Sequence, residues 1–249
     1  MASNMAKPLY DQIGIGYAGY RRPDSRIAAR IAAALGDAES VVNVGAGAGS
    51  YEPAGRRLAA VEPSAEMIRQ RVDGAAPAVR AVADALPFRD GAFDAALAIL
   101  TIHHWPDRRR GLRELRRVAR GPVVLLTWMP DHPPFWLYDY FPEIPATDLT
   151  IFPSLMEMED ALGPLEVAPV PVPADCTDGF LGAYWRRPAV YFDAGARGAI
   201  SAFARLSDPA PGLERLSADL ADGSWERRHG HLLALDELDV GYRLIVARP

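Results

Sequence analysis

The residues best placed to do chemistry form a loop of alternating glycines after a short apolar run at 41–44. Glycine has no Cβ and tolerates positive φ, so such a loop can turn sharply and bring its backbone against a ligand. A second apolar run, 59–61, ends at Glu62, whose carboxylate could accept hydrogen bonds from both hydroxyls of a ribose. Together these features indicate a nucleotide-containing cofactor. The loop glycines are Gly45, Gly47 and Gly49.

The spacing of these glycines discriminates between cofactors. A dinucleotide fingerprint, Gly-x-Gly-x-x-Gly, needs its third glycine one position further on, where the helix packs closely against the strand around a pyrophosphate. This chain has Ser50 at that position. The spacing therefore argues against NAD, and an NAD-dependent oxidoreductase is the least favoured of the alternatives.

Ordered segments in the first half of the chain resemble the class I S-adenosylmethionine-dependent methyltransferases (methyltransferase type 11), in particular the small-molecule branch that includes the ubiquinone and menaquinone methyltransferases. Several motifs in the right order are more specific than one glycine loop. The matching segments are 43–49 for the glycine motif, 61–67 for the ribose and adenine segment, 83–88 for the adenine loop, and 93–98, 103–107 and 114–118 for the fourth strand and its helix.

The resemblance implies binding of S-adenosyl-L-methionine, transfer of its methyl group to oxygen, nitrogen or carbon of a small organic acceptor, and release of S-adenosyl-L-homocysteine. It places Asp84 against the adenine amino group, with a turn-forming role as the alternative. It also implies that Tyr17 seals the methyl donor and that Arg21 pairs with the cofactor carboxylate, although this segment could instead pack as a plain arm. The expected cofactor residues are Tyr17, Arg21, Gly45, Ala46, Gly47, Glu62, Pro63, Ser64, Met67, Ala83, Asp84, Ala85 and Leu100.

The candidate catalytic residues are His103 and His104, which follow a predicted strand end. Methyl transfer from a sulfonium is an in-line displacement, so the protein must mainly align donor and acceptor and exclude water. A neutral imidazole, above all that of His104, could also take the proton that the acceptor loses. The alternative is that either histidine only hydrogen-bonds the backbone or closes over the cofactor.

Asn43 departs from the family pattern, which usually has Asp or Glu at this position. An amide can still hydrogen-bond, but a negative charge near the ammonium and sulfonium end of the cofactor is lost. We therefore expect weaker cofactor binding rather than none. The departure keeps a third alternative open, a protein that retains the fold and binds the cofactor without catalysis.

Composition narrows the class of protein and its partners. The 249 residues, 49% of them hydrophobic, can bury a full core, and the length fits one enlarged domain. The net charge of -5 gives no broad attraction to nucleic acid, and no apolar run reaches the roughly 18 residues of a membrane span. The lone Cys176 and the lack of a signal-peptide pattern favour the cytoplasm. We expect a small-molecule partner, no nucleic acid, no membrane and no metal, with a homodimer left open.

Hydrophobic patterning predicts an α/β fold, namely a Rossmann-like, mostly parallel seven-stranded sheet with helices on both faces and a helical, aromatic cap. Ligands of such sheets bind at the carboxyl ends of the strands. A helix is predicted at 24–35 with Asp24 as its N-cap, and most of the arginines between 108 and 120 are expected to face water from another helix. Strands are predicted at about 41–45, 58–62, 79–82, 93–99, 122–128, 165–172 and 240–247.

The domain organisation expected is a lid followed by a catalytic domain with insertions. Aromatic residues concentrate after residue 128, where they could pack in a core or stack on a planar acceptor. Insertions of this kind commonly determine substrate specificity. The predicted bounds are 1–23 for the N-terminal lid, 24–249 for the methyltransferase domain, and about 129–164 and 178–222 for the cap insertions.

Overall fold

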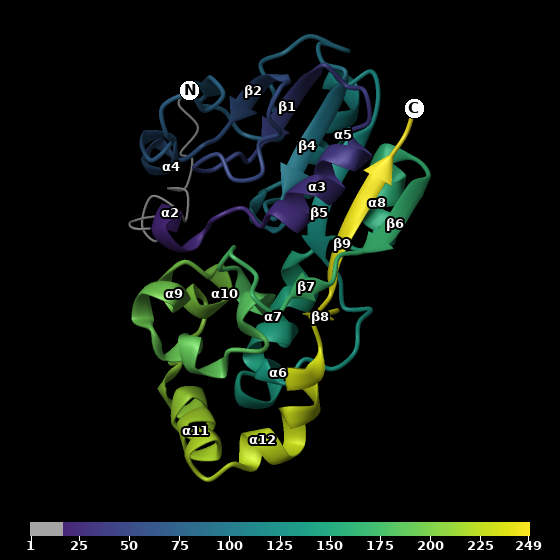
Figure 1. Ribbon diagram of the computed structural model, residues 1–249. Helices are drawn as coiled ribbons and strands as arrows, with labels where there is room; N and C mark the ends of the chain where they lie inside the picture. Colours follow the sequence, from purple (N-terminus) through teal and green to yellow (C-terminus); the bar gives the residue numbers. More distant parts are fainter. Residues whose placement is uncertain (1–16) are drawn as a thin grey trace.

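The computed structural model describes residues 17–249. Its centre is a seven-stranded sheet in the order β3-β2-β1-β4-β5-β9-β6 (Figure 1). β9 runs antiparallel to both of its neighbours, and the other pairs are parallel, which confirms the predicted fold class. The strands are β1 (Ser40–Val44), β2 (Arg57–Val61), β3 (Ala78–Val79), β4 (Ala95–Ile99), β5 (Val123–Trp128), β6 (Leu165–Pro169) and β9 (Tyr242–Ala247).

Alternate residues of the central strands face opposite sides of the sheet, and helices cover both sides. On β4, Ala95 and Leu97 join the apolar core on the α3 side, whereas Ala96 and Ala98 join the core under α5 and α8. Both faces are therefore apolar, as a parallel sheet between two helical layers requires. The helices of this half are α2 (Tyr17–Tyr20), α3 (Ser25–Ala34), α4 (Ala65–Arg69), α5 (Arg108–Val118) and α8 (Leu155–Leu162).

Helix α3 begins where the sequence predicts. The Asp24 carboxylate accepts a hydrogen bond from the Arg26 backbone N–H at 3.0 Å, which satisfies one of the donors left open at a helix N-terminus. Ile27 and Ile31, four residues apart, bury one face of the helix against the sheet. Gly36 follows the helix with a φ of +54°, a conformation that favours glycine.

A second, helical lobe lies below the sheet in Figure 1 and is built from residues after β5. Its interior is aromatic: Trp136 Nε1 donates to the Trp185 carbonyl at 2.8 Å, and the Tyr191 hydroxyl donates to the Leu181 carbonyl at 2.5 Å. Most aromatic residues of the cap thus form its own core. Its elements are α6 (Leu137–Tyr140), α7 (Glu143–Ile151), η2 (Leu181–Tyr184), η3 (Pro188–Phe192), α9 (Ala194–Gly198), α10 (Ser201–Ala204), α11 (Ala210–Ala221), α12 (Ser224–His229) and η4 (Gly230–Ala234).

The strand predicted at 165–172 is wrong beyond residue 169. β6 ends at Pro169, and β7 (Val172–Pro173) pairs with β8 (Glu237–Leu238) in a separate two-stranded sheet. Proline cannot donate a backbone hydrogen bond, and Pro169 and Pro171 fall at the point where the chain leaves the main sheet. The prolines therefore explain the break.

Some of the arginines of α5 also bind neighbouring elements. Arg108 donates to Glu157 of α8 at 3.3 Å and to the Ile151 carbonyl at 2.7 Å. Arg109 pairs with Asp160 of α8 at 2.9 Å. These charge-assisted bonds tie α5 to α8. Four of the seven arginines between 108 and 120 are nevertheless exposed, which confirms that most of them face water: Arg109, Arg110, Arg113 and Arg120.

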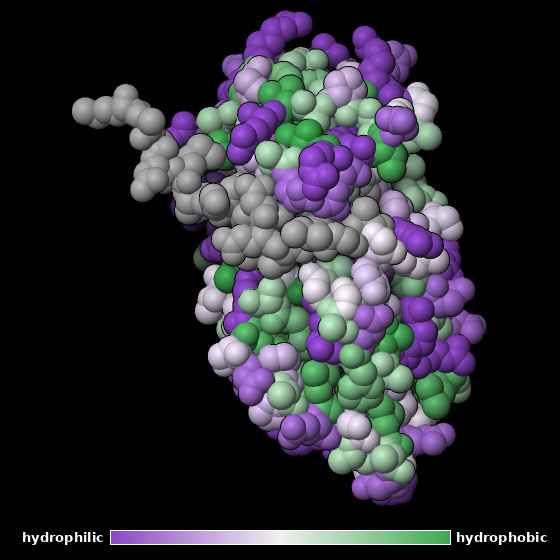
Figure 2. Space-filling model, turned by 90° about the vertical axis from the view of Figure 1, so that its left-hand side faces the viewer, coloured by the Kyte–Doolittle hydropathy of each residue, from purple (hydrophilic) through white to green (hydrophobic). Residues whose placement is uncertain are grey.

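Figure 2 shows one side of the molecule, where hydrophobic and hydrophilic residues are interspersed over the helical lobe. Scattered apolar residues of this kind are ordinary on protein surfaces. Over residues 17–249, no helix combines the length and the apolarity needed to cross a membrane.

Candidate active site

The glycine loop leaves the carboxyl end of β1 and folds over the end of β2. Gly45 and Ala46 donate their backbone N–H groups to the Val61 carbonyl, at 2.8 and 3.1 Å. Gly45 has a φ of +71°, and a Cβ at this position would overlap the side chain of Thr101, which follows β4. A residue with a side chain here would therefore strain the backbone and displace Thr101.

Glu62 follows β2 and connects the glycine loop to the start of α4. Its Oε2 atom accepts from the Gly47 N–H at 2.8 Å, and its Oε1 atom accepts from the Ser64 N–H at 2.9 Å. Ser64 in turn caps α4 by accepting from the Met67 N–H at 3.2 Å. Only 6% of Glu62 is exposed, so its carboxylate is held in one place at the carboxyl edge of the sheet.

The remaining predicted cofactor residues follow other strands at this edge. Residues 83–85 come after β3, which pairs in parallel with β2. The Leu86 N–H donates to Glu114 Oε2 of α5 at 2.8 Å, which fixes this segment on the helix. Pro63 lies between Glu62 and the cap of α4, and its carbonyl accepts from Arg80 Nε at 3.1 Å.

Leu100, which follows β4, has a φ of +51°. This conformation is uncommon for a residue with a branched side chain, and such strain tends to concentrate at ligand sites. Its N–H still donates to the Leu126 carbonyl at 2.8 Å, so the residue leaves the sheet only after its last ladder bond. The sharp turn leads into the short helix η1 (Ile102–His104).

A pocket lies between this edge of the sheet and the helical lobe. Leu100 and His103 contribute from the sheet edge. A lining of this kind fits a largely apolar, planar molecule with one or two polar substituents. The aromatic rings on the wall are Trp128, Phe152, Phe180 and Tyr242, and the charged groups are Arg21, Asp148 and Arg205.

The two histidines are half-buried in η1, and His103 lines the pocket. The His103 ring stacks on Phe152 with 4.2 Å between centroids. His104 Nδ1 lies 3.1 Å from Arg205 Nη2; because the guanidinium can only donate, Nδ1 is the acceptor. Burial, together with the positive charge of Arg205, lowers the pKa of His103 and lowers that of His104 to about 3. Both imidazoles are therefore neutral near pH 7.

Residues 42–126 match the methyltransferase-domain family. A protein of solved structure from Anabaena variabilis ATCC 29413, described as a methyltransferase from an antibiotic biosynthesis pathway, is 35% identical to this chain. The alignment covers 92% of this chain and 98% of that one, with a TM-score of 0.85. The chain belongs to the class I S-adenosylmethionine-dependent methyltransferases.

Two further proteins that resemble this methyltransferase are also methyltransferases. The chloroplastic 2-methyl-6-phytyl-1,4-hydroquinone methyltransferase 2 of Oryza sativa subsp. japonica is 39% identical over 62 residues, which are 25% of this chain and 18% of that protein. The matched part thus spans less than a fifth of the rice protein. A geranyl diphosphate C-methyltransferase from Streptomyces coelicolor A3(2), solved with S-adenosyl-L-homocysteine, is 18% identical over 90% of this chain and 77% of that chain, with a TM-score of 0.51, and shows the shared fold.

The methyltransferase offers an unpartnered polar atom where the family's cofactor binds. Asn43, only 1% exposed, donates from Nδ2 to Glu52 Oε1 at 3.4 Å, while its Oδ1 atom has no hydrogen-bond partner within residues 17–249. A buried oxygen without a donor is costly, and the cofactor ammonium is a donor of the right kind. The residues present therefore fit S-adenosylmethionine at this edge.

Glu52 is a site residue that sequence reasoning missed. It forms a largely buried ion pair with Arg71 at 2.6 Å, and Arg71 also donates to the Gly47 carbonyl at 3.1 Å. A carboxylate is thus present beside Asn43 after all, although Arg71 neutralises it. The available signal was its position, three residues after the last loop glycine.

Arg21 lines the pocket of the methyltransferase and is held there by Asp178 of the cap. Its Nε atom donates to Asp178 Oδ1 at 2.5 Å, and Asp178 is 0% exposed. The backbones of the two residues also form an antiparallel bridge. The pairing of Arg21 with the carboxylate of the cofactor stays a prediction. Tyr17 lies in α2, but its side chain is outside the described part of the chain.

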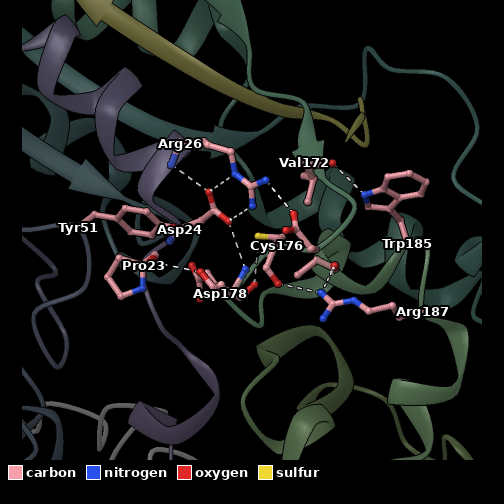
Figure 3. Close-up of polar contacts among 12 residues, drawn as sticks. Pro23, Asp24, Arg26, Tyr51, Val172, Cys176, Asp178, Trp185 and Arg187 are labelled. Atoms are coloured by element: carbon pink, nitrogen blue, oxygen red, sulfur yellow. Dashed lines mark hydrogen bonds and ion pairs between the residues drawn. The ribbon is translucent and has the colours of Figure 1, made fainter. Parts of the chain in front are cut away.

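A polar network fastens the start of α3 to the cap segment that carries Asp178 (Figure 3). Asp24 accepts from the Thr177 N–H at 3.2 Å, and Arg26 pairs with both Asp24 and Asp175. Cys176 lies within this segment, and burial raises the pKa of its thiol to about 12, so it is an unreactive thiol. The network holds the segment that precedes Asp178, the ion-pair partner of Arg21.

Proposed function

We propose that this methyltransferase transfers the methyl group of S-adenosyl-L-methionine to a small, ring-bearing acceptor held in the pocket below the sheet edge. The observation that carries the proposal is that Leu100 and His103 line this pocket at the edge where the glycine loop and Glu62 also lie. A donor at the loop and an acceptor in the pocket are thus neighbours. When bound, the cofactor supplies an electrophilic methyl group, and the protein aligns the acceptor and excludes water.

The roles proposed for the cofactor residues follow from their positions. Glu62 binds the ribose hydroxyls while its bonds to Gly47 and Ser64 hold it in place. Asn43 Oδ1 accepts from the ammonium group. The backbone of Gly45, Ala46 and Gly47 lies against the methionine part, Pro63, Ser64, Met67, Ala83, Asp84 and Ala85 contact the adenosine, and Tyr17, Arg21 and Leu100 enclose the methyl donor.

The acceptor class rests on the lining of the pocket rather than on the relatives. The rice hydroquinone methyltransferase matches this chain over too short a stretch to bring its substrate with it. The rings of Trp128, Phe152, Phe180 and Tyr242 instead favour a flat, apolar acceptor. A cytoplasmic location, a homodimer and the absence of a nucleic-acid partner stay predictions from composition.

Turnover tests the proposed function. Purified protein is incubated with S-adenosyl-L-methionine and a panel of phenols, aromatic amines and aliphatic alcohols, and release of S-adenosyl-L-homocysteine is followed. We expect turnover with ring-bearing members and none with the aliphatic alcohols. Tight cofactor binding with no turnover over a broad panel would instead favour the non-catalytic alternative.

His104→Ala is expected to lower kcat about 10-fold or more while the Kd for S-adenosyl-L-homocysteine changes little. The reason is that His104 Nδ1 accepts from Arg205 and so positions this pocket-lining guanidinium, whereas the cofactor is proposed to rest on the glycine loop and Glu62. Turnover and calorimetric titration measure the two quantities. His231→Ala, a histidine at the far end of the cap, is the matched control. Equal losses of kcat and cofactor affinity would reject a role at the acceptor.

A further inference from the structure

We propose that Asp148 of helix α7 is the catalytic proton acceptor of this methyltransferase and that the group it deprotonates is a hydroxyl on an apolar ring. The inference rests on the proposed function and adds a residue and an acceptor group to it. Sequence reasoning assigned no role to Asp148, which belongs to the cap rather than to the family motifs.

Asp148 is a buried acid on the pocket wall that has no polar partner within residues 17–249. It is 4% exposed and lines the pocket wall. Within residues 17–249, its carboxylate makes neither a hydrogen bond nor an ion pair. A buried carboxylate in this condition is unfavourable unless it is protonated or a ligand supplies the missing donor. An acceptor hydroxyl in the pocket is such a donor.

The surroundings of Asp148 bring the pKa of its carboxyl into the range that suits a proton acceptor. Burial raises the pKa of this carboxyl to about 7, against a smaller opposing effect of Arg205. A base is most effective when its pKa lies near the working pH. The pKa of His104, at about 3, makes that imidazole a much weaker base. The other ionisable groups around Asp148 are Tyr138 and Tyr242, which it influences electrostatically, and Arg21 and His103 on the pocket wall.

The charges on the pocket wall favour a hydroxyl over an amine. Arg205 lies beside His104, and the Arg21 guanidinium reaches the same pocket, although Asp178 neutralises much of its charge. Positive groups stabilise the negative charge that grows on an oxygen as it loses its proton, and they oppose an ammonium. A phenolic or enolic hydroxyl therefore fits these groups better than a protonated amine.

The proposed step conserves atoms and electrons. The acceptor O–H bond breaks, and its proton goes to the Asp148 carboxylate. The oxygen lone pair forms the new O–CH₃ bond as the S–CH₃ bond breaks, and the electron pair of that bond stays on sulfur, which leaves as a neutral thioether. The proton passes from Asp148 to solvent when the products depart, which restores the carboxylate.

The first arm of the test is catalytic and uses phenol, catechol and 1,4-hydroquinone as probes. Asp148→Asn is expected to lower kcat by about 100-fold or more and to remove the rise of kcat with pH near 7, with the Kd for S-adenosyl-L-homocysteine unchanged. Asp148→Glu should restore part of the rate. Glu143→Gln, an exposed acid on the same helix, is the control and should behave as wild type. An Asp148→Asn variant with nearly full kcat and an unchanged pH profile would overturn the proposal.

The second arm needs no turnover. An ordinary aspartate has a pKa of about 3.9 in the unfolded chain, so the raised folded pKa penalises the native state as pH rises from about 4 to about 7. The amide of the Asp148→Asn variant carries no charge to penalise. The Tm of this variant relative to wild type should therefore rise by several degrees between pH 4 and pH 8. A Tm difference that does not change with pH would contradict a desolvated, titrating Asp148.

The outcomes separate the two proposals. Failure to bind S-adenosyl-L-homocysteine would defeat the proposed function itself. Binding without turnover of any phenol would overturn the hydroxyl assignment, while the Tm series would still decide whether Asp148 titrates in the required range. Turnover with aromatic amines alone, together with loss of kcat in Asp148→Asn, would keep the residue and overturn the acceptor group.

Discussion

Glu62→Ala will weaken the binding of S-adenosyl-L-homocysteine by about 100-fold or more, equivalent to about 3 kcal/mol. Two losses add in this variant. The carboxylate can no longer accept from ribose hydroxyls, and the Gly47 and Ser64 N–H groups lose the acceptor that holds the glycine loop against the start of α4. Calorimetric titration of the variant against wild type measures the effect.

The matched control for Glu62 is Glu39→Ala. Glu39 is an acid that directly precedes β1, at the opposite end of the strands, so its removal changes the net charge equally without touching the loop. The Kd should stay within about twofold of wild type. An equal loss of affinity in both variants would show that overall charge, rather than the Glu62 site, governs binding.

Gly45→Ala will lower the free energy of unfolding by about 3 kcal/mol and remove measurable cofactor binding. Alanine is strained at the φ of +71° that Gly45 adopts, and its Cβ would also overlap the side chain of Thr101. Urea unfolding followed by circular dichroism gives the stability, and titration gives the affinity.

Gly55→Ala separates strain from overlap. Gly55 has a φ of +77°, but a Cβ there would meet no heavy atom within 4 Å. This variant should lose only about 1 kcal/mol of stability and keep cofactor affinity. If both glycine variants lost the same stability, the overlap of the added Cβ with Thr101 would not contribute to the loss.

The cofactor half of the molecule could be predicted from sequence because its signals are local. An apolar strand, a glycine loop and an acid at the next strand end lie within about twenty residues, and the sheet places them at one edge by its topology alone. Asn43 shows the limit of this reasoning. Its replacement of an acid is visible in the sequence, but the nearby Glu52 and its pairing with Arg71 depend on how the loop folds back.

The acceptor half could not be predicted because its residues meet only through long-range packing. Arg21 and Asp178 are 157 positions apart, and no sequence pattern predicts that they form an ion pair. Helix α7 also gave no sequence signal, because Pro145 and two threonines interrupt any apolar stripe. Asp148 therefore resembles an ordinary surface acid until the cap buries it. The aromatic residues were visible, but most serve the interior of the cap.

The most direct test of the central claim is a calorimetric titration of the wild-type protein with S-adenosyl-L-methionine, S-adenosyl-L-homocysteine and NAD. Binding of the first two with micromolar Kd, and no detectable binding of NAD, is the expected result. Binding of NAD alone, or of none of the three, would contradict the assignment of the glycine loop and Glu62 to S-adenosylmethionine.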